Sequence, residues 1–126
     1  MKKEIILSKN APSPIGPYSQ AVKIDGTLYI SGQIAIDPET GNLVTNDVTS
    51  ETNMVMNNLG AILNAAGMDY GHVIKCTIFI RHMEDFSVIN AAYGSFFKID
   101  PPARETVEVS KLPKDVNVEI SCIAVE

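Results

Sequence analysis

Several residue types and sequence motifs that commonly serve catalysis are scarce or missing in this 126-residue chain. It has two cysteines and two histidines, and it contains no GxSxG, P-loop, GxGxxG or CxxC motif. His72 and His82 lie at opposite ends of one predicted strand, and no second cluster of ligand residues accompanies them. A metal site is therefore not expected, and a Ser–His–Asp triad has no evident base.

Basic residues and long apolar runs are also in short supply. Ten Lys and Arg stand against fifteen Asp and Glu, for a net charge of −5, without the basic stripe that a phosphate backbone requires. Nucleic-acid binding is disfavoured. No apolar run is long enough to span a membrane, and the N-terminal apolar stretch, residues 5–7, is too short for a signal peptide. We expect a cytoplasmic protein without a membrane partner.

The length suits a single domain over residues 1–126 that buries a core without a disulfide staple. Cys76 and Cys122 each lie inside an apolar strand pattern. We expect them to be buried free thiols.

Hydrophobic periodicity predicts the element order β-β-β-α-β-α-β-β. Asp25–Gly26 between two apolar runs predicts a type I′ hairpin. Asp47 or Thr49 can cap the first helix, and Gly67 can end it. The predicted strands are 4–7, 18–24, 27–33, 72–82 and two within 101–126; the predicted helices are 47–66 and 84–98; residues 10–17 and 37–46 are loops.

Asparagines mark both predicted helices. The first helix has an apolar stripe, and the opposite side carries Asn53, Asn57, Asn58 and Asn64. In the second helix, Asn90 lies within the stripe formed by Phe86, Ile89, Tyr93, Phe96 and Phe97. An amide there must find partners. Spacing leaves open whether those are local backbone groups or part of a functional site.

Two helices can cover only one face of a mixed sheet of five or six strands. The second face is predicted to mix apolar and polar side chains, which suits a subunit interface with clefts between chains. The residues assigned to this face are Tyr29, Ser31, Lys75, Thr77, Phe79, Thr106, Glu119 and Ile123.

The last 26 residues hold two strand patterns joined by a loop that could make them neighbours. Arg104 and Glu119 each point away from the apolar side of their own strand, so we place them on one face. One interpretation is a site for a small anion and a water; the other is an exposed salt bridge worth under about 1 kcal/mol. Spacing alone favours the salt bridge.

Six short motifs favour the anion site over the salt bridge, because together and in this order they are specific for one protein family. The chain resembles the reactive intermediate deaminase family, also called Rid or YjgF, nearly from end to end. The motifs are Ile15-Gly-Pro-Tyr18-Ser-Gln20, Ile30-Ser31-Gly-Gln33, Asn64-Ala-Ala-Gly67, Asp85-Phe-Ser-Val-Ile-Asn90, Pro102-Ala-Arg104, and Leu112-Pro-Lys-Asp115 followed by Val118-Glu119-Ile120.

The resemblance implies an α/β (α+β) chorismate-mutase-like fold and a homotrimer with a ligand cleft at each subunit interface. It also implies an enzyme of the enamine/imine deaminase branch. Such an enzyme hydrolyses 2-iminobutanoate, 2-iminopropanoate and 2-aminoacrylate to a 2-keto acid and ammonia, and it needs no cofactor or metal because the imine carbon is already electrophilic.

By the same resemblance, Arg104 grips the substrate carboxylate and Glu119 orients or deprotonates the attacking water. Tyr18 forms a wall of the pocket. Polar contacts come from Ser31 and Asn90 and from the backbone of Thr106.

The chain departs from the family pattern at three places. Many deaminase-branch members have Cys at the position of Thr106 and a small residue at that of Glu105, and residues 98–101 are shorter than in many relatives. A backbone contact at Thr106 survives such a change, whereas thiol chemistry does not. The shorter segment leaves the rim of the cleft and the substrate size open.

Two other functions compete with deamination. One is an endoribonuclease or translation inhibitor, against which the net charge and the lack of a central histidine argue. The other is a non-catalytic sensor that uses Arg104 to bind a 2-keto acid. The sequence does not separate binding from turnover.

Overall fold

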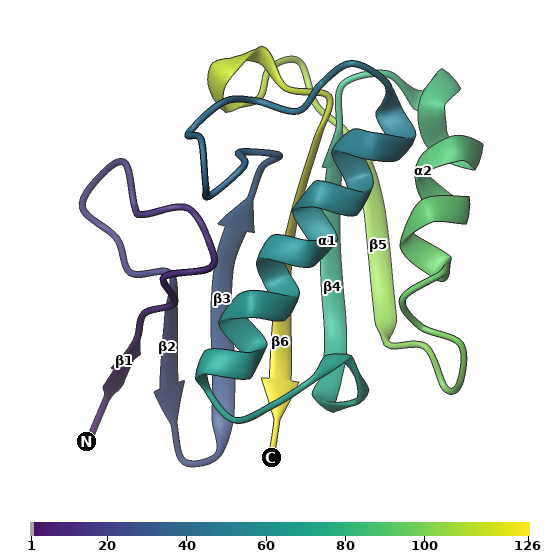
Figure 1. Ribbon diagram of the computed structural model, residues 1–126. Coiled ribbons are helices and arrows are strands. Elements are labelled where there is room, and N and C mark those ends of the chain that lie inside the picture. Colours follow the sequence, from purple (N-terminus) through teal and green to yellow (C-terminus); the bar gives the residue numbers. More distant parts are fainter. Residues whose placement is uncertain (1) are drawn as a thin grey trace.

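The computed structural model describes residues 2–126, and six strands form one mixed sheet with two helices packed on the same face (Figure 1). The strands are β1 (Glu4–Ile6), β2 (Ala21–Ile24), β3 (Thr27–Gln33), β4 (Val73–Ile80), β5 (Ala103–Glu108) and β6 (Val118–Val125). The helices are α1 (Val48–Ala65) and α2 (Phe86–Gly94). The predicted element order and the two-layer arrangement are confirmed.

The sheet order is β1-β2-β3-β6-β4-β5, and β4–β5 is its parallel pair. The last strand, β6, therefore lies between β3 and β4, antiparallel to both. The prediction that the loop after β5 makes β5 and β6 neighbours is wrong, since β4 separates them. This loop instead carries the chain across the end of β4, and β5 is left at the edge of the sheet.

The β2–β3 hairpin turns at the predicted residues. Asp25 and Gly26 have φ angles of 49° and 79°, the left-handed pair that a type I′ turn requires. Further along β3, the register with β6 shifts by one residue between Ile30 and Gln33, which places a β-bulge at Ser31–Gly32.

Helix α1 begins and ends as predicted. Asp47 caps it by accepting a hydrogen bond from Ser50 N at 2.7 Å, and the chain leaves through Gly67 at a φ angle of 76°. Asn58, however, is buried: its amide donates to the carbonyls of Ile34 and Ile36 at 3.2 and 2.9 Å. It ties the segment after β3 to the helix.

Helix α2 is shorter than the predicted 84–98. A 3₁₀ turn, Met83–Asp85, precedes it, and beyond Gly94 the N–H groups of residues 95–97 bond to carbonyls three residues back. The tightened turn aims Phe96 and Phe97 at the ring of Tyr70, with centroids 5.3 and 6.0 Å away. Aromatic packing thus replaces the last helical turn.

The main core lies between the helices and the sheet. It contains the inward side of α1, Ile89 and Tyr93 of α2, and alternate residues of the strands, including both cysteines. The cysteines are free and buried, as predicted. Within residues 2–126, neither helix combines the length and apolar character needed to cross a bilayer.

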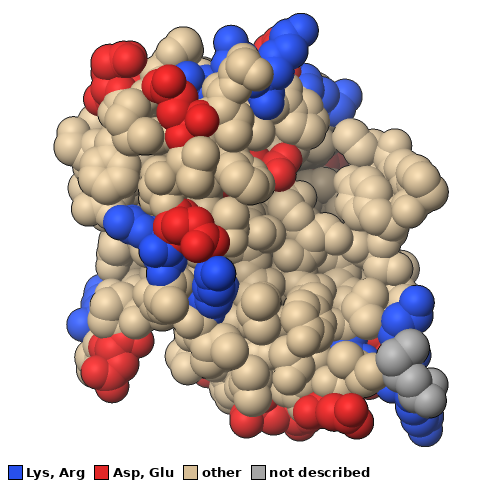
Figure 2. All heavy atoms as spheres, turned by 180° about the vertical axis from the view of Figure 1, so that it is seen from behind, with Lys and Arg blue, Asp and Glu red and all other residues tan. Residues whose placement is uncertain are grey.

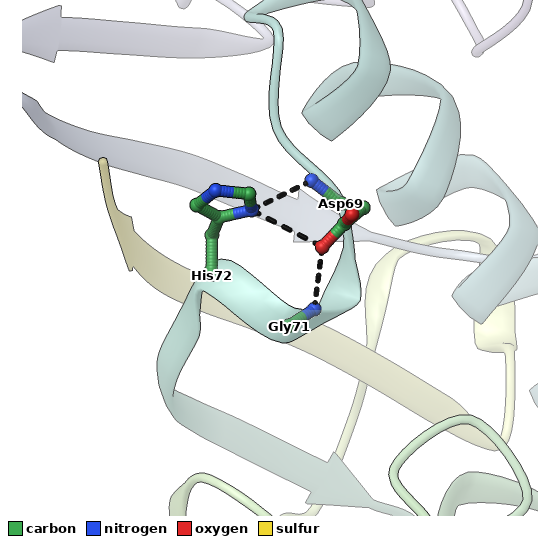
Figure 3. Close-up of polar contacts among 3 residues, drawn as sticks. All are labelled: Asp69, Gly71 and His72. Carbon is green, nitrogen blue, oxygen red and sulfur yellow. Dashed lines mark hydrogen bonds and ion pairs between the residues drawn. The ribbon is translucent and has the colours of Figure 1, made fainter.

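A 3₁₀ turn, Tyr70–His72, leads the chain from α1 into β4 (Figure 3). Asp69 Oδ1 accepts a hydrogen bond from Gly71 N at 2.8 Å, and Asp69 N donates to His72 Nδ1 at 3.1 Å. His72 therefore serves a reciprocal capping arrangement at the start of β4.

Candidate active site

The sheet face opposite the helices, here called the open face, is largely free of charged side chains in its centre and on the right of Figure 2, and a group of both signs lies at mid-height on the left. A cavity of about 360 Å³ lies at the end of β3 and the start of β6. We call it the Glu119 cavity; its lining comes from the proline-rich loop, β3 and the segment after it, the turn before β6, and the start of β6. The lining residues are Pro12, Ser13, Ile15, Tyr18, Gln20, Ser31, Gly32, Gln33, Ile34, Ile36, Pro113 and Glu119.

Glu119 supplies the one acidic group of this cavity. It is the second residue of β6 and pairs with Phe79 of β4, so its side chain lies on the open face. Among residues 2–126, its carboxylate has no hydrogen-bond or ion-pair partner within contact distance, and partial burial raises its pKa above the ordinary value. A half-buried carboxylate with free lone pairs is suited to accept a proton from a water.

The bulge in β3 makes room for this carboxylate. A Cβ atom at Gly32 would lie 2.5 Å from Glu119 Oε2, closer than any non-bonded contact permits. Only glycine at this position leaves the carboxylate where it is.

Hydrogen bonds to the backbone hold the walls of the cavity. Ser31 Oγ donates to Ser19 O at 2.7 Å, and the hydroxyl of Tyr18 accepts from Ile15 N at 3.3 Å. Gln20, which is buried, accepts from Ser8 N at 2.6 Å and donates to Pro12 O at 2.9 Å. Sequence reasoning placed Gln20 within a motif but gave it no role. A polar residue directly before an apolar strand and after a proline-rich loop was the available signal.

Arg104 lies in a different place. It pairs with Cys76 of β4, whose side chain is buried beneath the helices, so Arg104 lies on the helix side of the sheet edge. Its Nη1 donates to Asn90 Oδ1, and its guanidinium lies 5.7 and 5.2 Å from the ring centroids of Phe86 and Tyr93. Asn90 thus finds its polar partner in a side chain, and two aromatic rings and an amide fix the cation.

Thr106 follows Arg104 on the same side of β5. It pairs with Ile78, so the prediction that it belongs to the open face is wrong. Its Oγ1 and the hydroxyl of Tyr93 are buried without a hydrogen-bond partner among residues 2–126.

The six predicted site residues therefore form two groups. Tyr18, Ser31 and Glu119 meet at the cavity on the open face. Arg104, Asn90 and Thr106 lie between β5 and α2 on the other side of the sheet. The prediction that Arg104 and Glu119 share a face is wrong.

The reason is that the apolar sides of β5 and β6 face opposite layers. The apolar side of β6, Val118 and Ile120, packs under the helices. On the apolar side of β5, Val107 pairs with Phe79, and Val109 packs into a small cluster with Phe79 and Val116 at the open face. Within one chain the two groups cannot reach one small molecule.

The comparisons with known proteins match the parts of the chain that contain both groups of site residues. A family model described as Endoribonuclease L-PSP matches residues 8–126. The mouse 2-iminobutanoate/2-iminopropanoate deaminase is 44% identical over 124 residues, which cover 98% of this chain and 92% of the mouse protein.

Two crystal structures agree with the fold over nearly the whole chain. The conserved Rid family protein YyfA from Yersinia pestis is 49% identical with a TM-score of 0.97, covering 99% of this chain and 100% of that one. The E. coli protein TdcF with bound serine is 41% identical with a TM-score of 0.94, covering 98% of each chain.

Proposed function

Because the chain belongs to the endoribonuclease L-PSP family, also known as the Rid or YjgF family, we propose that it is a 2-iminobutanoate/2-iminopropanoate deaminase. It hydrolyses the imine of a 2-imino acid to a 2-keto acid and ammonia. The observation that carries the proposal is the half-buried, unpartnered carboxylate of Glu119 in a cavity large enough for such a substrate.

Arg104 binds the substrate carboxylate. A guanidinium offers two parallel N–H groups to a planar carboxylate, and this one is oriented by Asn90 and by the rings of Phe86 and Tyr93. Among residues 2–126, no carboxylate lies within ion-pair distance of Arg104. The similarity to TdcF, whose crystal structure holds serine, supports a ligand of the size and charge of an amino acid.

Glu119 activates water. It takes a proton from a water molecule whose oxygen attacks C2 of the imine, and the electron pair of the C=N π bond moves to nitrogen, which receives that proton. A second transfer through Glu119, from the new hydroxyl to the amino group, expels ammonia and leaves the C=O of the keto acid. An enamine such as 2-aminoacrylate first gains a proton at C3 and loses one from nitrogen to become the imine.

The complete site is formed by two copies of the chain, with the Arg104 group of one facing the Glu119 cavity of the next. Two features support this. No Lys or Arg lines the Glu119 cavity, and Arg104 lies at edge strand β5. The open face also exposes about half of Tyr29 and Val107, apolar surface that a second copy would cover. A closed ring of three copies uses such a head-to-tail contact three times.

A coupled assay tests the activity. Threonine dehydratase generates 2-iminobutanoate, and the rate of 2-oxobutanoate release is followed with and without the protein. Acceleration by the parent protein and its loss in Glu119→Gln, by roughly 10²- to 10⁴-fold, support a general base. Equal rates with and without the parent protein would rule out the deaminase.

Mixing two impaired variants tests the shared site. Arg104→Lys and Glu119→Gln chains, unfolded and refolded together, should recover about a quarter of the parent's sites, because half the copies bring Arg104 and half of their neighbours bring Glu119. Each variant refolded alone is the control. Activity in the mixture no greater than the mean of these two controls would place both residues' action within one chain.

The same variants separate an enzyme from a sensor. A sensor needs the Arg104 group to bind a 2-keto acid but does not need a base. Binding of 2-oxobutanoate by Glu119→Gln, measured by calorimetry, should match the parent while turnover is lost. A parent protein that binds this keto acid without hydrolysing imines would be a sensor.

A further inference from the structure

A buried acid lies behind the Glu119 cavity, on the first turn of α1. Glu51 is fully shielded from solvent. Its Oε2 accepts hydrogen bonds from the backbone N–H groups of Asn117 and Val118 at 2.7 and 3.2 Å, and its Oε1 accepts from Asn117 Nδ2 at 2.8 Å. No Lys, Arg or His among residues 2–126 forms an ion pair with it.

The two backbone groups that Glu51 holds directly precede Glu119. They form the junction at which the chain enters β6, and Arg81 N donates to Asn117 O at 3.0 Å from the other side. The turn just before this junction is irregular, because Lys114 and Asp115 both adopt φ angles of 55°. A strand that follows such a turn takes its starting position from whatever fixes its first residues.

We propose that Glu51 is a positioning residue for Glu119: by holding Asn117 and Val118, it fixes where β6 begins and therefore where the Glu119 carboxylate enters the cavity. This inference rests on the proposed deaminase function. Glu51 lies on the helix side of the sheet and acts on the site through the backbone of Asn117 and Val118. On the open face, Gly32 leaves space for the Glu119 carboxylate.

The reach of Glu51 matters more than its charge. All three of its partners are N–H donors without formal charge. The oxygen of a glutamine could accept both backbone donors, and its NH₂ would face Asn117, whose amide can rotate to present its oxygen. An aspartate keeps the charge but is one methylene too short to reach the junction without moving it.

The experiment compares these two variants. Glu51→Gln should retain kcat within a few-fold of the parent, whereas Glu51→Asp should lose on the order of ten- to a hundred-fold in kcat, the effect of a displacement near 1 Å. The Kd for 2-oxobutanoate should stay near that of the parent in both, since Arg104 provides that binding. The opposite order, with Asp active and Gln inactive, would overturn the proposal in favour of a purely electrostatic role.

A matched control separates positioning from general destabilisation. Thr52 is the next residue of α1, is equally buried, and donates only to Val48 O within the helix at 2.8 Å. Thr52→Val should lower the thermal midpoint without changing kcat below that temperature. If it lowered kcat as much as Glu51→Asp does at an equal loss of stability, Glu51 would be merely structural. Should Glu51→Asp fail to fold, Glu51→Met fills the space without an acceptor and should show the same loss of kcat.

A readout that does not depend on activity keeps this inference separate from the proposed function. The ¹³C resonance of the Glu119 carboxyl, assigned by its absence in Glu119→Gln, is followed against pH. Its midpoint should be the same in the parent and Glu51→Gln and should move in Glu51→Asp or Glu51→Met. An unmoved midpoint in the last two would overturn the positioning role, even if the parent proved inactive on imines.

Few groups of the same chain can affect the Glu119 titration, and the Arg104 of a neighbouring copy is common to all the variants compared. Tyr18 is the other titratable residue lining the cavity. From β4, Phe79 lies opposite Glu119, and Arg81, further along, is 3.8 Å from Asp115. The bulge of β3 contributes Ser31 and Gly32 to the cavity lining, and neither is a titratable residue.

Discussion

Arg104 is held by its shape as much as by its charge, because two rings and an amide contact the planar guanidinium. Arg104→Lys keeps the charge but loses the fork and the stacking. Losing one charged hydrogen bond costs about 1.5–3 kcal/mol, so kcat/KM for imine hydrolysis should fall on the order of ten- to a hundred-fold.

The control is a second arginine, whose side chain contacts no site residue. Arg81→Lys changes a partly exposed arginine near Asp115, and it should leave the same rate unchanged. Turnover by Arg104→Lys at the parent's rate would remove Arg104 from the site.

Glu119 carries a stability cost that can be measured. Burial raises its folded-state pKa above the ordinary 4.5, so the neutral form fits the fold better than the charged form. Stability from this group is present below pH about 4.5 and is lost as pH rises through the folded-state pKa. Glu119→Gln should therefore raise the thermal midpoint at pH 7 and raise it less as pH falls toward 4.

That comparison should be made on a monomer, since a neighbouring Arg104 would favour the charged form. A Tyr29→Glu background, in which a charge on the open face opposes assembly, supplies one. A midpoint at pH 7 that is equal or lower in Glu119→Gln would mean that the fold accommodates the carboxylate without strain.

At the scale of single residues, the sequence identified which residues belong to the site better than it identified their contacts. The motifs identified Arg104, Asn90 and Glu119, but the partner of Asn90 became visible only once β5 lay beneath α2. Glu51 was not singled out and Gln20 was given no role, because each bonds to backbone groups that are distant along the chain. A spacing pattern within one element carries no information about such donors.

At the scale of elements, the bulge in β3 connects sequence to site most directly. Gly32→Ala places a methyl group against Glu119 Oε2, so the carboxylate must move. We expect a fall in kcat that Gly94→Ala does not cause, because a Cβ added at Gly94 would meet nothing within 4 Å. Crystal structures of both variants would show whether the carboxylate has moved, and an unmoved Glu119 would contradict the argument.

The elements themselves were largely predictable, because capping residues, the Asp25–Gly26 turn and alternation all act locally. Strand neighbours were not. The two C-terminal strands are close in sequence, yet β6 inserts between β3 and β4, where its apolar side meets the helices. Alternation tells which residues of one strand share a side, but not which layer that side faces.

For the whole molecule, the open face is the surface left uncovered by the two helices. Tyr29 is half exposed on it, so Tyr29→Glu should spare the fold of a single chain and oppose burial against another. We expect a trimer mass for the parent and a monomer mass for the variant by light scattering. Asn57→Glu is the control, since Asn57 is exposed on α1, on the opposite side of the sheet from the open face.

A monomer mass for the parent at micromolar concentration would contradict both the trimer and the shared site. Loss of the trimer in Asn57→Glu as well would mean that the effect is not specific to the open face. Tyr29→Glu should also lose imine hydrolysis if the site needs two copies.

Cys76 and Cys122, which are free thiols opposite each other on β4 and β6, can report when the sheet opens. The two thiols lie opposite each other on the central strands β4 and β6, at 1% and 4% exposure. An alkylating reagent can reach either sulfur only when these two strands separate. Both thiols should therefore be modified together, at the rate at which the sheet unfolds. Labelling followed by mass spectrometry would then count chains with two adducts or none, and single adducts would reveal fraying that stops short of the middle of the sheet.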